Sequence, residues 1–218
     1  MVAAKSLLTA ALIGLIWADV ALADPPTVRI SSADQAKARA ALLRRADFGA
    51  GWLGGPIRTS PLSSPHCPGF DPKESDLVVT GHADARYTFK GAGVELDQDV
   101  QVLADQNAVR TDFARTISPQ LAKCIGFQLQ KLPHVVAVHV TRVPFPPTGS
   151  VSAVYRAEID VRTPKGQGRL ISDYVFFGEG RMEHEFTVIA PVGARDQLGQ
   201  FELQLAQIVL RRAGAAPA

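Results

Sequence analysis

The clearest pattern in the chain is an alternation of apolar and polar residues between positions 77 and 104. From Leu77 to Phe89, every second residue is apolar or small, and a second alternating stretch follows the Lys-Gly-Ala-Gly turn at 90–93. Successive side chains of a strand point to opposite faces, so each stretch predicts a strand that is buried on one face. The short turn between them predicts a β-hairpin.

Four further stretches predict strands in the second half of the chain, at 135–142, 151–161, 169–177 and 182–188. Short turns rich in Gly and Pro separate them, which favours antiparallel pairing. Residues 24–30 predict either a linker or a first strand. The glycine-rich segment 49–56 predicts a turn that ends the preceding helix.

Three segments predict helices. Residues 34–46 are strong helix formers, and Ser32 with Gln35 forms a capping-box pattern before them. Asp105 is predicted to cap a second helix, which breaks or restarts at Pro119 and continues to residue 126. Residues 193–212 form an amphipathic pattern of the same kind.

These elements predict an α+β fold: a single antiparallel sheet of about six strands, packed with three main helices over one or both faces. The domain is expected to span residues 24–213, with a disordered tail at 214–218. Its length is enough for one sizeable core and short for two.

The first 23 residues have the three parts of a secretory signal peptide. Lys5 gives the positive start, residues 6–17 are apolar, and a small-x-small site ends at Ala23. A membrane-spanning helix needs about 20 apolar residues, and Asp19 interrupts this run. We therefore expect a protein that is secreted or held in the cell envelope, with no stable membrane anchor after cleavage.

The chain has two cysteines, Cys67 and Cys124. An oxidising compartment favours a disulfide between them, and the alternative is two buried free thiols. The disulfide would tie the Pro- and Ser-rich loop at 56–76 to the inner face of the second helix. His66 adjoins Cys67, but no second Cys or His stands at ligand spacing around the pair, so no metal site and no cofactor are expected.

Charge gives little information about partners. The formal net charge is +2, and the Lys and Arg residues are scattered, so nothing favours nucleic acid or an anionic membrane. A small apolar ligand or another envelope protein is the expected partner.

Three stretches follow one another in a recognisable order: LLRRADFGAGW, LDQDVQVLADQNAVRTDFARTISPQLAKC and ISDYVFFGEGRMEHEFTV. This order resembles a set of secreted actinobacterial proteins related to the extracellular sensor domain of mycobacterial receptor serine/threonine kinases. It is similar, more loosely, to the Mog1/PsbP-like lipoproteins. The resemblance implies an antiparallel sheet backed by helices and a ligand-binding groove, with no established activity. The kinase sensor domains have two disulfides, whereas this chain can form one.

Candidate catalytic residues are few. His82 falls on the predicted outward face of its strand and is expected to be solvated, whereas His184 falls on an inward face and is expected in the core. Glu183 and Glu185 form an outward carboxylate pair on the opposite face from His184, and Asp97 and Asp99 form a similar pair; both pairs are expected on solvated strand faces.

No nucleophile-elbow, phosphate-loop or His-Glu-x-x-His pattern is present. The sequence therefore predicts a non-catalytic binding or sensor-like domain, with no catalytic residues and an unidentified ligand site. The alternatives are a structural or protein-interaction domain, and a secreted hydrolase whose residues converge from distant positions.

Overall fold

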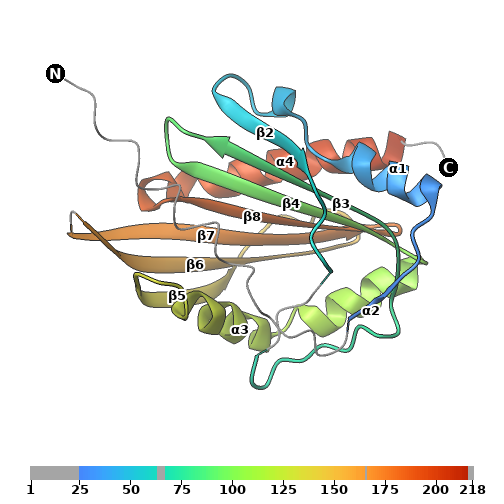
Figure 1. Ribbon diagram of the computed structural model, residues 1–218, viewed down its shortest axis with the longest axis horizontal. Coiled ribbons are helices and arrows are strands. Elements are labelled where there is room, and N and C mark those ends of the chain that lie inside the picture. The colour runs from blue at the N-terminus through green and yellow to red at the C-terminus, as the bar shows by residue number, and fades with distance from the viewer. Residues whose placement is uncertain (1–24, 63–66, 165, 216–218) are drawn as a thin grey trace.

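The computed structural model describes residues 25–62, 67–164 and 166–215, so the predicted signal peptide lies outside the described residues. The described part contains four helices and one eight-stranded, mostly antiparallel sheet (Figure 1). This confirms the α+β fold with a single sheet. The sheet has two strands more than expected.

The strands lie in the order β1-β3-β4-β8-β7-β6-β5, and β2 also pairs with β3. All pairs are antiparallel except β1 with β3. The predicted hairpin is β3 with β4, and β7 lies between β8 and β6 in the middle of the sheet. The strands are β1 (Thr27–Val28), β2 (Trp52–Ile57), β3 (Val78–Phe89), β4 (Val94–Leu103), β5 (Val135–Val143), β6 (Val151–Thr163), β7 (Gly166–Glu179) and β8 (Met182–Pro191).

Strand β2 takes up residues 52–57, so the prediction of a turn over 49–56 is wrong from Trp52 onward and holds only for the residues just before it. Gly54 has φ 120°, and a Cβ atom there would lie 2.0 Å from the carbonyl oxygen of Arg86 on β3. Only glycine fits this close approach of the two backbones. The glycine here therefore belongs to a strand, although glycine-rich segments usually indicate a turn. Trp52 at the start of β2 is buried and stacks on Phe89 and Phe201.

The helices are α1 (Ser32–Ala41), α2 (Gln106–Thr116), α3 (Pro119–Gln130) and α4 (Arg195–Ala215). Asp105 caps α2 by accepting a hydrogen bond from the Ala108 N–H at 2.9 Å, as predicted. The cap of α1 is Ser31 rather than Ser32. The predicted second helix is divided into α2 and α3 at Pro119, and α4 continues to Ala215.

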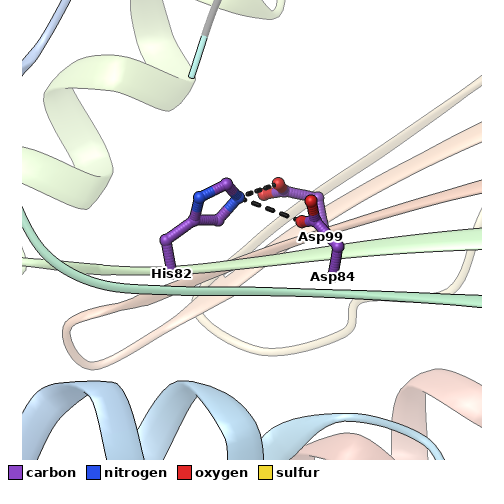
Figure 2. A group of neighbouring side chains, drawn as sticks. All are labelled: His82, Asp84 and Asp99. Carbon is purple, nitrogen blue, oxygen red and sulfur yellow. Dashed lines mark hydrogen bonds and ion pairs between the residues drawn. The ribbon is translucent and has the colours of Figure 1, made fainter. Parts of the chain in front are cut away.

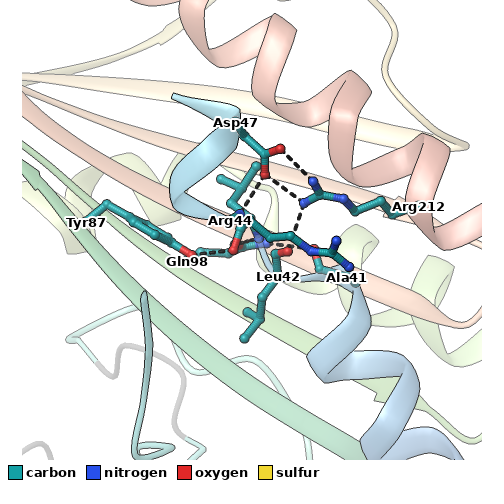
Figure 3. A network of polar contacts seen from close by, with 8 residues as sticks. Ala41, Leu42, Arg44, Asp47, Tyr87, Gln98 and Arg212 are labelled. Carbon is teal, nitrogen blue, oxygen red and sulfur yellow. Dashed lines mark hydrogen bonds and ion pairs between the residues drawn. The ribbon is translucent and has the colours of Figure 1, made fainter. Parts of the chain in front are cut away.

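Helix α1 ends at Ala41, five residues before the predicted end, because the following backbone is bound to the sheet (Figure 3). Gln98 accepts a hydrogen bond from the Leu43 N–H at 2.8 Å, and the hydroxyl of Tyr87 donates to the Leu43 carbonyl. Arg212 of α4 donates to the Leu42 carbonyl at 3.1 Å. Arg212 also donates to both carboxylate oxygens of Asp47, at 2.7 and 2.6 Å, in the short 3₁₀ helix after α1.

The helices cover both faces of the sheet. Helices α1 and α4 pack on one side, the α1/α4 face, and α2 and α3 pack on the other, the α2/α3 face (Figure 1). Gly178 of β7 lets α2 approach closely, since a Cβ atom there would lie 2.7 Å from Val109. Core residues of the α1/α4 face include Ala38, Leu43, Tyr87, Leu96, Phe177, Phe186, Leu205 and Val209. Those of the α2/α3 face include Leu121, Ile125, Leu129, Ala153, Tyr155 and Ala157.

Cys67 and Cys124 form the predicted disulfide, with their Cα atoms 5.4 Å apart. Cys124 lies on the buried side of α3, where Leu121 and Ile125 also pack. A disulfide is consistent with an extracellular protein. None of the helices in the described ranges has the length and apolar character that crossing a membrane requires.

One carboxyl group is buried between α4 and the sheet. Glu202 is 1 % exposed, and nearby Asp173 is fully buried and binds Arg156 through both carboxylate oxygens, at 2.8 and 2.5 Å. Burial, and then the charge of Asp173, raise the pKa of Glu202 to about 9. Glu202 is therefore protonated at neutral pH.

We expect Cys124→Ser to destabilise the protein. The crosslink closes a separation of 57 residues, and the loop-entropy model gives about 4 kcal/mol for such a loop. Urea unfolding of the oxidised wild type and the variant measures the difference. Equal unfolding free energies, or two alkylatable thiols in the unreduced wild type, would contradict the disulfide.

We expect Glu202→Gln to change how stability depends on pH. The folded pKa of Glu202 is about 9 and the ordinary value is 4.5, so folding retains a proton that the unfolded chain releases between these values. Wild-type stability from this group is complete below pH 4.5 and is lost as the pH rises through about 9. The variant should gain stability relative to wild type between pH 5 and pH 8.5 in urea unfolding. A difference that stays constant over this range would show that Glu202 is not protonated.

Candidate functional site

Three carboxylates lie side by side across the α2/α3 face of the sheet. Asp84 of β3 is the register partner of Asp99 of β4, and Asp99 is the register partner of Glu185 of β8. We call these three residues the acidic row. Side chains directly opposite each other have Cβ atoms about 4.5–5.5 Å apart, and like charges at that distance are destabilising. The row therefore needs protons or a cation.

One histidine serves two of these carboxylates (Figure 2). His82 precedes Asp84 by two positions on β3, so both side chains lie on the same face. Its Nε2 atom lies 2.6 Å from Asp99 Oδ2 and 3.0 Å from Asp84 Oδ1. The side chains of His82 and Asp84 are each 8 % exposed, whereas that of Asp99 is 34 % exposed. The cluster is therefore buried on its β3 side and reaches solvent at Asp99.

The imidazole cannot satisfy both carboxylates. Nε2 carries one N–H, and the hydrogen bond it makes is the one to Asp99. Asp84 Oδ1 lies near the same nitrogen but is buried and receives no hydrogen bond from any described residue. Each such buried oxygen costs about 1–3 kcal/mol. The cluster thus contains one carboxylate oxygen, Asp84 Oδ1, that receives no hydrogen bond from its donors.

The pKa values follow from this charge balance. Burial alone would lower the pKa of His82, but its close contacts with the carboxylates of Asp84 and Asp99 raise it to about 9. Burial alone would raise the pKa of Asp84, but the nearby His82 ring and a hydrogen bond from the backbone of Ser60 lower it. Burial, and then the charge of Asp99, raise the pKa of Glu185 to about 8. At neutral pH, therefore, Glu185 of the acidic row is protonated and the neighbouring His82 is positively charged.

The far oxygens of the two aspartates are fixed by neighbours outside the cluster. The Ser60 N–H, on the segment after β2, donates to Asp84 Oδ2 at 2.7 Å. The side-chain amide of Gln101 donates to Asp99 Oδ1 at 3.3 Å. In both aspartates, the remaining oxygen faces His82 Nε2. This division orients both carboxylates toward one point.

A second group of acids adjoins the row under α2. Glu183 lies beside Gln101 in register, and its Oε1 atom is buried without a hydrogen-bond partner among the described residues. Burial, and then Asp112 of α2, raise the pKa of Glu183 well above its usual value. Burial also raises the pKa of Asp112. The acidic character therefore extends from the row toward α2.

The structure corrects the prediction that this face of β3, β4 and β8 is solvated. His82 is buried, and the segment after β2 lies close enough to this face for the Ser60 N–H to bind Asp84. Glu183 and Glu185 are half-buried. Asp97 fits the prediction better: it is about a third exposed and pairs with Arg86, whose Nε lies 2.6 Å from Asp97 Oδ1.

The core position predicted for His184 is confirmed, but neither ring nitrogen has a hydrogen-bond partner among the described residues, so the ring is not satisfied as a core histidine usually is. The side chain is 2 % exposed on the α1/α4 face and stacks on Phe177, with ring centroids 4.7 Å apart. Burial lowers its pKa to about 3, so the ring is neutral. Glu183 and Glu185 lie on the opposite face from this residue, as the alternation indicated.

The clustering of His82 with Asp84 and Asp99 was missed from sequence. Asp84 was not a candidate at all, because a single Asp in an alternating strand has no distinguishing pattern. The available signal was the cross-strand register of the predicted hairpin, which places Asp84 opposite Asp99. Counting back from the turn at 90–93 gives this pairing.

We expect the His82 ring to titrate near pH 9 in chelator-treated buffer. Asp99→Asn should move that midpoint down toward 6.5, because one of the two carboxylates that stabilise the charged ring is removed. Since the folded pKa is above the unfolded one, the stability that this contact contributes is complete below pH 6.5 and is lost as pH rises through about 9. NMR titration of the ring C–H signals measures the shift.

Asp97→Asn is the matched control, since Asp97 lies two positions away on the same face and pairs with Arg86. It should leave the His82 midpoint within a few tenths of a pH unit. A wild-type midpoint at or below 6.5 would contradict the cluster.

Comparison of the chain with models of protein families, with curated proteins and with solved structures found no match. The resemblance to kinase sensor domains therefore stays a prediction from the quoted residues. The function has to be argued from the chemistry of the acidic row and His82.

Proposed function

We propose that this protein is a secreted, non-catalytic binding domain of the cell envelope that takes a cationic ligand at the acidic row. The observation that carries the proposal is the alignment of Asp84, Asp99 and Glu185 across three neighbouring strands with His82 as their cationic partner. The disulfide is consistent with the extracellular location.

Charge supports a cation rather than the small apolar ligand expected from the sequence. The row keeps its protons only because burial and mutual repulsion raise the pKa of Glu185, while His82 carries the opposing charge. A cation placed among these oxygens lets the carboxylates ionise without repelling one another. Binding therefore relieves an unfavourable arrangement that the fold imposes.

The histidines favour binding over catalysis. Nε2 of His82 is occupied by two carboxylates, and His184 is buried, neutral and without a hydrogen-bond partner among the described residues. A general base needs a ring nitrogen within reach of a substrate proton. The contacts described for His82 Nε2 and for the His184 ring do not place either of them in such a position. No observation on the described residues supports the two alternatives, a secreted hydrolase and a structural or protein-interaction domain, as strongly.

The proposal is tested by thermal unfolding with probes of different charge. ZnCl₂, CaCl₂ and spermidine are the cationic probes, sodium sulfate tests anions and glucose tests neutral ligands. We expect at least one cation to raise the Tm of the wild type, because a ligand at 100 times its Kd adds about 2.7 kcal/mol of stability. The double variant Asp99→Asn/Glu185→Gln, which removes charge but conserves shape, should lose this increase.

Asp97→Asn again serves as the control and should keep the increase. Stabilisation by sulfate or glucose alone would overturn the proposal. A cation effect that is equally large in the double variant would also overturn it, because the ligand would then bind elsewhere.

A further inference from the structure

We infer that the ligand of the acidic row is a divalent transition-metal ion of the Zn²⁺ class, bound by His82 Nε2, Asp84 Oδ1 and Asp99 Oδ2. This inference rests on the proposed function and deepens it by naming the ion and its three protein ligands. It departs from the sequence-based expectation of no metal site, which considered the surroundings of Cys67 and known metal motifs but not side chains brought together across strands.

The geometry fits an ion. The three ligand atoms lie within 4.8 Å of one another, and two of the separations are 2.6 and 3.0 Å. Ligand atoms about 2.0–2.1 Å from a tetrahedral Zn²⁺ are roughly 3.3 Å apart. A small adjustment of these side chains therefore changes a proton-held cluster into a metal-held one. The Nε2 proton occupies the place that the ion would take.

An independent observation comes from Asp84. The side chain is more than nine-tenths buried, and its Oδ1 atom faces His82 Nε2 at 3.0 Å without receiving a hydrogen bond. Buried carboxylate oxygens in folded proteins are nearly always partnered. A metal ion between Oδ1 and Nε2 supplies the missing partner.

The surroundings resemble the outer shell of a metal site. Asp84 is held through Oδ2 by the Ser60 N–H, and Asp99 is held through Oδ1 by Gln101. Each carboxylate thus uses one oxygen for orientation and presents the other to the shared point. Such outer-shell hydrogen bonds orient the ligands of metal sites and raise their affinity.

The ligand set selects the class of ion. One imidazole and two carboxylates suit borderline ions such as Zn²⁺, whereas Ca²⁺ takes six to eight oxygen ligands. Two ionised aspartates also balance the charge of a divalent ion. Three protein ligands leave a fourth position, and the side chain of Asp99 is 34 % exposed, so the ion reaches the site from solvent on this side.

The inference is tested on untagged protein that has been treated with a chelator and dialysed. Isothermal titration with ZnCl₂, together with elemental analysis after dialysis, should give one ion per chain. Asp99→Asn should weaken zinc binding by at least about tenfold, because it removes a first ligand. Asp97→Asn, on the same strand and face, should change the affinity by less than about threefold.

His82→Gln separates the failure of this inference from the failure of the proposed function. Zinc needs the Nε2 lone pair, so the variant should bind zinc at least about tenfold more weakly. An organic cation such as spermidine competes with the charged imidazole, so its binding should be unchanged or stronger in the variant. Unfolding curves without ligand check that each variant is folded.

Three results would overturn the metal site: no zinc bound per folded chain, equal losses in Asp97→Asn and Asp99→Asn, or unaltered zinc binding in His82→Gln. If spermidine then still binds and Asp99→Asn/Glu185→Gln abolishes it, the proposed function stands without the metal. If zinc, calcium and spermidine all fail to bind, both are wrong. Co²⁺ substitution adds a second readout, since His82→Gln should alter the visible absorption of a bound cobalt ion.

Discussion

The antiparallel register of β3, β4 and β8 is the constraint on which the rest of the structure depends. It places the apolar positions of all three strands on the α1/α4 face, where Tyr87, Leu96 and Phe186 form the core. The same register places Asp84, Asp99 and Glu185 in one line on the other face. A shift by one residue would exchange these two faces, so the core and the acidic row are fixed together.

Most of the fold could be predicted because alternation and helix signals are local. The hairpin, the cap at Asp105 and the restart at Pro119 follow from short stretches of sequence, and the disulfide partners follow from the presence of only two cysteines. The errors lie where tertiary contacts override local preference. Strand β2 exists because glycine permits close approach to β3, and α1 ends early because Gln98, Tyr87 and Arg212 bind the backbone that follows it.

The candidate site could be predicted only in part. The alternation assigned His82, Asp99 and Glu185 to one face of their strands, which is correct. It did not show that this face is covered, because the cover comes from tertiary contacts of the segment after β2 and of α2, which alternation within the strands does not reveal. Burial changes the meaning of these residues, since a solvated carboxylate needs no partner and a buried one does.

The contact between Ser60 and Asp84 determines which residue types position 60 can accept. Its donor is a main-chain amide, so any residue except proline at position 60 supplies the same hydrogen bond. Natural variants are free to exchange the side chain there while the site keeps its form. What has to stay fixed is the short spacing between the end of β2 at Ile57 and position 60, which places that amide beside Asp84.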